Sequence, residues 1–155
     1  MTQKIALPHE RLLAYQVALE LLRQVQELSI ADVRMRDQIL RAARSVCLNI
    51  AEGVGRVGAG DKKRVYGIAR GECCEAAAAL DVAIAGSECD AIESRAARDT
   101  AGRLYALLTG LMRRYDSETF RPKTSHPTVD RNTNETEIGD DNERESGSEQ
   151  EHETG

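Results

Sequence analysis

Residues 9–121 contain no proline, and apolar side chains recur along most of this span at helical spacing. Proline interrupts a helix because it lacks an N–H and clashes with the preceding turn, so about a hundred residues can be helical without an internal break. Ala, Leu, Arg and Glu dominate the composition, and aromatic residues make up only 3%. That composition favours helices packed on helices over a sheet. The sequence therefore predicts an all-α fold.

The periodicity divides into four helical segments that are separated by short connections. The predicted helices span residues 8–28, 33–52, 61–85 and 91–115. Short connections favour antiparallel neighbours, so we expect an up-down-up-down four-helix bundle. Gly53 follows the second helix, and we expect it to cap that helix with a positive φ. Asp61 and Asp90 are the expected N-caps of the third and fourth helices.

The first helix carries two apolar stripes, whereas a surface helix of a monomeric bundle normally keeps a broad polar face. The stripe expected to face the core consists of Leu13, Ala14, Val17, Leu21, Val25 and Leu28. The second stripe consists of Leu12, Tyr15, Leu19 and Leu22. We interpret the second stripe as an oligomer interface, so the chain is expected to self-associate. The alternatives are a deeply buried helix or leucines that simply lie at the surface.

Polar side chains line one face of the second helix, and two glutamates lie in or beside the apolar face of the third helix. The polar stripe is made of Arg41, Ser45, Asn49 and Glu52. The expected core stripe of the third helix is made of Val65, Ile68, Ala69, Ala76, Leu80 and Ala83. Glu72 falls within that apolar sector and Glu75 lies at its edge.

These six polar residues are expected to form a structural network. Asn is unfavourable inside a helix and an unpaired buried carboxylate is costly, so we expect a tertiary hydrogen bond for Asn49 and cationic partners for the carboxylates. The available donors are Arg41, Arg44 and Arg56, because a guanidinium can engage a carboxylate through two bonds. The alternative is that the stripe is a site for a ligand or a partner.

Five cationic residues in and after the glycine-rich connection are the best candidates for binding nucleic acid. They are Arg56, Lys62, Lys63, Arg64 and Arg70. Clustered Lys and Arg bind nucleic acid by releasing counterions from the phosphates. No aromatic residue except Tyr66 interleaves with them, so base stacking has little support. We favour the simpler interpretation, which is a solvated face.

The negative charge of the chain lies in its C-terminal segment. Residues 1–117 carry 17 Lys and Arg against 15 Asp and Glu, a net charge of +2, whereas residues 118–155 carry 4 against 11, a net charge of −7. The C-terminal segment has too few apolar side chains to offset the entropy of ordering. We therefore expect a bundle domain over residues 1–117 and a disordered acidic tail over residues 118–155. A nearly neutral bundle is also a weak match for nucleic acid.

Neither a metal site nor an active site is recognisable in the sequence. The four cysteines lack C-x-x-C spacing and the three histidines are scattered, so no metal is expected. Because no nucleophile–base pair or phosphate loop is visible, we expect a protein that is not an enzyme and uses no cofactor. No signal core or membrane span is present, so we expect a cytoplasmic protein with no membrane partner.

The segment over residues 38–56 resembles the signature of a known bacterial family. It reads Gln38-Ile-Leu-Arg-Ala-Ala-x-Ser-Val-x-x-Asn-Ile-Ala-Glu-Gly-x-x-Arg56. Two further segments, Ala14-Tyr-Gln-x-Ala18 and Tyr66-x-Ile-Ala-Arg-Gly71, are similar to its first and third helices. The family is that of the four-helix-bundle proteins first found in intervening sequences of bacterial 23S ribosomal RNA genes. Its superfamily includes the accessory variability proteins of diversity-generating retroelements.

The resemblance implies an antiparallel four-helix bundle that assembles as a homopentamer. For the retroelement accessory proteins, it further implies binding to a reverse transcriptase and to nucleic acid. We therefore expect a non-enzymatic, homo-oligomeric bundle that acts as an assembly or adaptor module. The alternative is a nucleic-acid-binding accessory protein that partners a reverse transcriptase.

Overall fold

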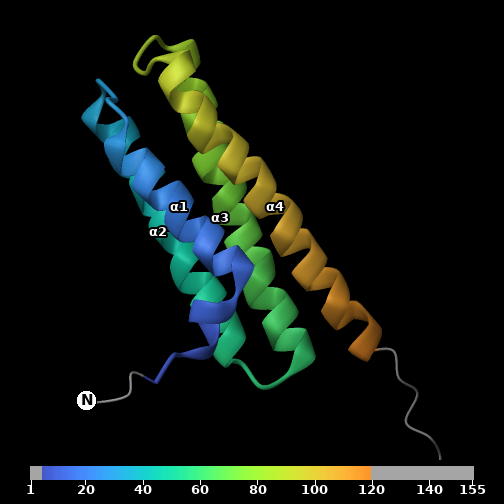
Figure 1. Cartoon of the computed structure of the whole chain (residues 1–155). Coiled ribbons are helices and arrows are strands. Elements are labelled where there is room, and N and C mark those ends of the chain that lie inside the picture. Colours follow the sequence, from blue (N-terminus) through green and yellow to red (C-terminus); the bar gives the residue numbers. More distant parts are fainter. Residues whose placement is uncertain (1–4, 120–155) are drawn as a thin grey trace, which may run out of the picture. The chain divides into compact units, whose positions relative to one another are not determined.

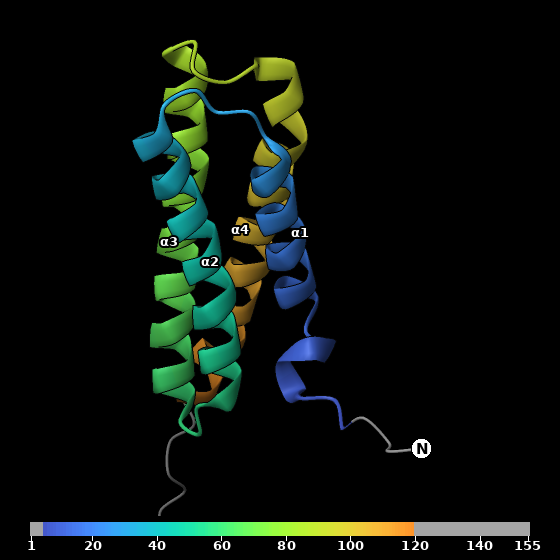
Figure 2. The ribbon, with the colours of Figure 1, turned by 90° about the vertical axis from the view of Figure 1, so that its left-hand side faces the viewer.

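The computed structural model describes residues 5–119, which form one short 3-10 helix and four α-helices (Figure 1). The elements are η1 (Pro8–Arg11), α1 (Leu13–Glu27), α2 (Val33–Gly55), α3 (Ala59–Ala85) and α4 (Ala91–Thr119). No strand occurs among these residues. Each helix packs against two neighbours in the order α1–α2–α3–α4–α1, and consecutive helices run in opposite directions (Figure 2). The predicted all-α, up-down-up-down four-helix bundle is therefore confirmed.

The first predicted helix is divided at Leu12. This residue has an extended backbone, with φ −83° and ψ 121°, so the residues before it form a separate 3-10 turn. Side chains hold this turn against α1. The ring of His9 packs edge-on against that of Tyr15 with centroids 4.7 Å apart, and Gln16 Nε2 donates to the Glu10 carbonyl at 3.1 Å. The apolar spacing continues across the break, which is why the pattern predicts a single helix.

Aspartates begin α2 and α4. Asp32 accepts a hydrogen bond from the backbone N–H three residues later at 2.6 Å. Asp90 accepts from the N–H groups two and three residues later at 2.7 and 2.9 Å, so its predicted N-cap role is confirmed. The N-cap predicted at Asp61 is wrong, because α3 begins earlier and has Gly58 as its N-cap.

Gly53 is an interior residue of α2 and does not cap it. The helix continues to Gly55 and the Gly53 backbone is helical, so the predicted positive φ is wrong. A Cβ on Gly53 would lie 2.6 Å from Cε1 of Tyr66, whose ring is almost completely buried. The glycine is therefore required by the close approach of α3. Lys62 satisfies the end of α2 instead, because its Nζ donates to the Val54 carbonyl at 2.9 Å.

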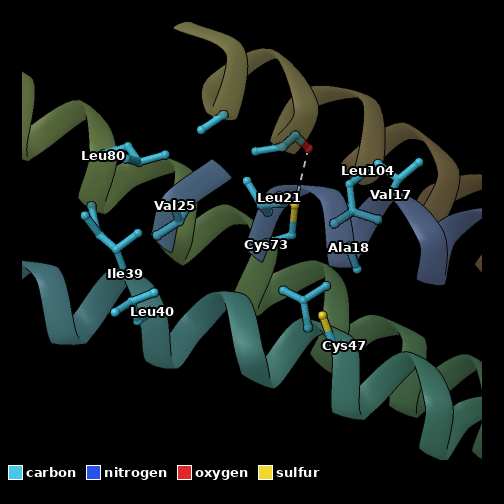
Figure 3. Packing of buried hydrophobic residues seen from close by; sticks show 14 of the residues in the cluster. Val17, Ala18, Leu21, Val25, Ile39, Leu40, Cys47, Cys73, Leu80 and Leu104 are labelled. Carbon is cyan, nitrogen blue, oxygen red and sulfur yellow. Dashed lines mark hydrogen bonds between the residues drawn. The ribbon is translucent and has the colours of Figure 1, made fainter. Parts of the chain in front are cut away.

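The core consists of aliphatic and small side chains that all four helices contribute (Figure 3). Its largest fully buried aliphatic side chains include Leu21, Ile39, Ile50, Leu80, Leu104 and Leu108. Full burial of one such side chain stabilises the fold by about 1.5–3 kcal/mol. Two predicted core residues are wrong, since Leu13 is 57% exposed and Ile68 is 42% exposed. Both lie at the edge of their stripe, where a small rotation of the helix decides between core and surface.

The fourth helix extends past its predicted end and past residue 117, where the domain boundary is predicted, to Thr119. From residue 120 onward, the predicted acidic tail lies outside the described residues. No helix within residues 5–119 is long and apolar enough to cross a lipid bilayer.

Candidate partner-binding surfaces

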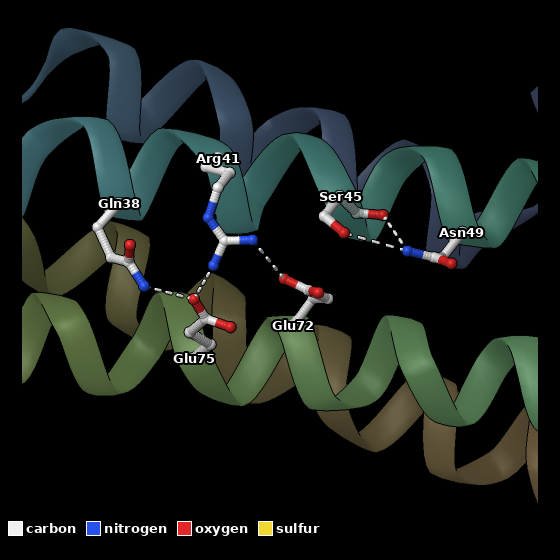
Figure 4. A network of polar contacts seen from close by, with 6 residues as sticks. All are labelled: Gln38, Arg41, Ser45, Asn49, Glu72 and Glu75. Carbon is white, nitrogen blue, oxygen red and sulfur yellow. Dashed lines mark hydrogen bonds and ion pairs between the residues drawn. The ribbon is translucent and has the colours of Figure 1, made fainter.

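The polar stripe of α2 meets the carboxylates of α3 along the α2–α3 seam (Figure 4). Arg41 pairs with both carboxylates, through Nη2 with Glu75 Oε1 and through Nη1 with Glu72 Oε2 at 4.0 Å. Gln38 Nε2 also donates to Glu75 Oε1 at 2.6 Å. The side chain of Arg41 is 56% exposed and that of Glu72 is 21% exposed, so this cluster runs from the surface into the seam. Ion pairs with this much solvent contact contribute only about 0–1 kcal/mol.

The other residues of the predicted network are not joined to this cluster. Asn49 Nδ2 donates to the Ser45 carbonyl at 2.9 Å and to the Ser45 hydroxyl at 3.1 Å. Within the described residues, the tertiary bond predicted for Asn49 is thus replaced by one inside its own helix. Glu52 pairs with Arg56, and this hydrogen bond, followed by the charge of Asp61, raises the pKa of Arg56. The sequence pattern overestimated the burial of the stripe, whose side chains are accessible to a partner.

The predicted cationic patch surrounds the α2–α3 connection, but carboxylates neutralise much of it. Arg56 lies 3.4 Å from Asp61, and Arg64 lies 2.9 Å from the same carboxylate. Lys63 pairs with Asp116 of α4. An anionic ligand would therefore have to compete with pairs that already exist.

The two remaining cations of the patch contact aromatic rings. Nζ of Lys62 lies 6.0 Å from the centroid of the Tyr115 ring while it caps α2. The Arg70 guanidinium lies 5.5 Å from the centroid of the Tyr105 ring of α4. Both contacts lie at the favourable range for a cation over a ring, so these side chains also stabilise the α3–α4 seam.

The second apolar stripe of α1 lies at the margin of the core. Its four side chains are partly exposed and pack against the buried core cluster. They belong to Leu12, Tyr15, Leu19 and Leu22. The stripe is therefore neither fully buried nor freely projecting. It presents an apolar margin that a neighbouring molecule could cover without first separating the helices.

An apolar groove of about 480 Å³ lies at the surface between α1 and α4. The apolar side chains and glycine that form it include Leu13, Ala14, Ala106, Leu107, Gly110 and Leu111. Arg103, which pairs with Glu20 of α1, and Arg114 are its charged lining residues. Sequence reasoning missed this groove, although Leu107 widens the helically spaced apolar stripe of Leu104, Leu108 and Leu111 and was the available signal.

A smaller groove of about 360 Å³ lies between α3 and α4 and includes Cys73 and Cys74. Cys73 donates to the Ala101 carbonyl at 3.3 Å (Figure 3), and burial raises its pKa to about 12. Burial also raises the pKa of Cys47 to about 11. Thiols with raised pKa are poor nucleophiles, so Cys47 and Cys73 act as small core residues. Cys74 is exposed, and Cys89 is buried.

No three His, Cys, Asp or Glu side chains are arranged to hold a metal ion in the part of the chain that the structure describes.

The sequence model for the 23S rRNA-intervening sequence protein matches residues 10–110, which is well over half of the 155 residues. The chain belongs to the 23S rRNA-intervening sequence protein family. The matched region begins in η1 and includes α1, α2, α3 and most of α4. No curated protein matches the sequence.

In this member of the 23S rRNA-intervening sequence protein family, the segment over residues 38–56 helps to join α2 to α3. Gln38 and Arg41 hold Glu75 of α3, and Gly53 accommodates the ring of Tyr66. These residues therefore account for helix packing. The α1–α4 groove is formed by other residues.

Proposed function

We propose that this family member is a non-enzymatic, self-associating four-helix-bundle protein that acts in the cytoplasm as an assembly or adaptor module. The incomplete covering of α1 supports the proposal. This helix has 15 residues, beside 29 in α4, and its side chains Tyr15, Leu19 and Leu22 remain partly exposed. A second copy that covered them would gain roughly 25 cal/mol for each Å² of apolar surface removed from water.

A homopentamer is the assembly that the resemblance implies. A ring forms when two different faces of a chain meet head to tail and the rotation closes. The α1 stripe and the α1–α4 groove meet at Leu12 and otherwise consist of different residues, which is compatible with contacts of that type. The polar stripe along α2 and α3 serves in this proposal as structural support for the bundle.

The test is Leu19→Glu, which places a charge in the stripe. We expect the assembly to dissociate with little change in helix content, as measured by light scattering and circular dichroism. Gln26→Glu is the control, because it adds the same charge to the same helix at an exposed position. A wild-type chain that stays monomeric at micromolar concentration would contradict self-association.

A second candidate is a nucleic-acid-binding accessory protein that partners a reverse transcriptase, related to the accessory variability proteins of retroelements. The gathering of Arg56, Lys62, Lys63 and Arg64 around one helix connection favours it. The carboxylates of Asp61 and Asp116 weigh against it, because they already pair with Arg56, Lys63 and Arg64.

Salt-dependent titration with a nucleic acid tests the second candidate. The variant is Lys63→Glu with Arg64→Glu, which spares the Lys62 cap of α2. Loss of one phosphate contact should lower the salt slope by about 1. Arg34→Glu with Arg36→Glu is the control at the other end of α2. Equal effects of the two double variants, or no binding by the wild type, would eliminate this candidate.

A further inference from the structure

The chain enters its bundle through an apolar arm, residues 5–7, that the described residues leave uncovered. Ile5 is 87% exposed and Leu7 is 54% exposed. Leu7 has an extended backbone, with φ −74° and ψ 151°. Ile5 and Leu7, both apolar and exposed, together make up the apolar edge of the arm.

The direction of the arm keeps it away from the α1–α4 groove of its own chain. The extended backbone at Leu12 separates η1 from α1. The turn then packs against α1 and α2. In both views the arm leads from η1 away from α4 (Figures 1 and 2). An arm that leaves on this side is placed to reach a neighbouring molecule.

The α1–α4 groove matches the arm in chemistry. It is lined mainly by aliphatic side chains, and a Cβ on Gly110 would meet no atom within 4 Å. Its two arginines are already engaged, Arg103 with Glu20 and Arg114 in an interaction within its own chain. Apolar side chains can therefore enter the groove without leaving an unpaired charge behind, which would be costly.

The arm also matches the groove in length. Residues 5–7 span at most about 11 Å when extended, at ~3.6 Å per residue. The part of α4 that lines the groove between Leu107 and Arg114 rises about 10 Å, at 1.5 Å per residue.

We propose that the arm of one copy docks through Ile5 and Leu7 in the α1–α4 groove of a second copy. This inference rests on the proposed self-association and gives it a specific contact. Each copy then offers one arm and one groove, so the contact is head to tail and closes when every groove is filled.

Two variants of the full-length chain test the contact from its two sides. Ile5→Ser with Leu7→Ser removes the apolar edge, and Gly110→Leu fills the groove while raising helix propensity. We expect each to raise the dissociation constant of the assembly about tenfold or more in sedimentation experiments. Gly102→Leu is the matched control, because Gly102 is also an open position of α4 but does not line this groove.

The outcomes separate this inference from the proposed function. If the wild type is monomeric, self-association fails and the arm contact fails with it. If Leu19→Glu dissociates the assembly but the arm and groove variants do not, self-association stands and the arm contact is wrong. An effect of Gly110→Leu alone would assign the groove to another occupant and would also overturn the inference.

A disulfide cross-link identifies the occupant directly. In a Cys74→Ser background, one chain carries Ile5→Cys and the other carries Gly110→Cys. Mixing the two should yield a disulfide between copies on oxidation, whereas Gly102→Cys in place of Gly110→Cys should not. A single chain that carries both new thiols and forms the bond internally at high dilution would show that the arm folds back on its own groove, which overturns the proposal.

Discussion

The α2–α3 seam is closed by specific contacts, whereas the α1–α4 seam is open over part of its length. In the first seam, Gly53 receives the Tyr66 ring and Arg41 bridges the carboxylates of α3. In the second seam, Leu13 remains 57% exposed beside an apolar groove, and Arg103 forms an ion pair across it with Glu20. The two seams should thus differ in how they tolerate larger side chains. Added volume destabilises a closed seam, whereas an open seam can accommodate it.

This difference shows that the most recognisable segment of a sequence need not mark its binding surface. The segment over residues 38–56 carries the resemblance to the family and is used to pack α2 against α3. The groove is formed by leucines, alanines and a glycine that no motif singles out. Variants at the two seams should therefore have unlike effects on stability and on association.

The largest effect is expected for Gly53→Ala, which adds a methyl group where the Tyr66 ring lies 2.6 Å away. Overpacking lowers the free energy of unfolding by about 1–3 kcal/mol, whereas replacing a helical glycine by alanine raises it by up to about 1 kcal/mol. Because the ring is buried and cannot withdraw, we expect a net loss of about 2 kcal/mol in the free energy of unfolding, measured in urea. Gly71→Ala is the control in α3, where a new Cβ meets open space, and it should stabilise the chain by about 0.5–1 kcal/mol. Equal effects of the two changes would mean that the seam is not closed.

Alkaline pH should loosen the same seam. Burial, and then the neighbouring Tyr115, raises the pKa of Tyr66 from 10.0 to about 12. The unfolded tyrosine ionises at lower pH than the folded one, so the contribution of Tyr66 to stability is complete below pH 10 and is lost between pH 10 and 12. At about 1.4 kcal/mol for each pKa unit, the loss from Tyr66 should not exceed about 3 kcal/mol. Tyr66→Phe should flatten the urea-derived profile in this window, and an unchanged slope would contradict the assignment.

The raised pKa values of Cys47 and Cys73 act in the same direction, because a buried thiol also resists ionisation. Their contribution begins near pH 9, the ordinary value for a thiol. The comparison of wild type and Tyr66→Phe isolates the tyrosine, since both proteins keep the two cysteines.

A smaller effect is expected for Arg41→Met. The half-exposed ion pairs of Arg41 contribute no more than about 1 kcal/mol, and this contribution should shrink as salt is added. Arg44→Met is the control, because Arg44 is exposed and forms no ion pair within the described residues. Thermal melts at low and high salt measure the difference. A loss of several kcal/mol in the free energy of unfolding would instead support the buried network that the sequence predicts.

The smallest effect on folding is expected for Leu13→Ala at the open seam. Because this side chain is 57% exposed, the free energy of unfolding of the monomer should change by no more than about 0.5 kcal/mol. The measurement is made at a concentration below that of assembly. A much larger loss would show that the groove is closed in solution by part of the same chain.

The bundle itself was predictable because apolar spacing and the absence of proline are local properties of the sequence. The N-cap at Asp90 was predictable for the same reason, since capping involves neighbouring residues only. The role of Gly53 was not, because glycine after an apolar stripe usually ends a helix. Glycine is required at position 53 because of the ring of Tyr66, which lies thirteen residues later on another helix.

The candidate surfaces were predictable only in part. The sequence predicted an arginine partner for the carboxylates of the third helix and left three arginines open, of which Arg41 pairs with Glu75. Their exposure was not predictable, because it depends on how far α2 rotates against α3. The open groove depends on the break at Leu12 and on the unequal lengths of α1 and α4, and neither follows from residue spacing.

The distribution of the four thiols turns the chain into its own reporter of unfolding. Cys74 alone is exposed, whereas Cys47, Cys73 and Cys89 are buried. A maleimide applied briefly near neutral pH should therefore modify one position of the folded chain, and the others only after the helices part. The mass of the modified chain would then count opening events without an added dye. Because the buried thiols come from α2, α3 and the α3–α4 connection, the order in which they react would reveal which part of the bundle opens first.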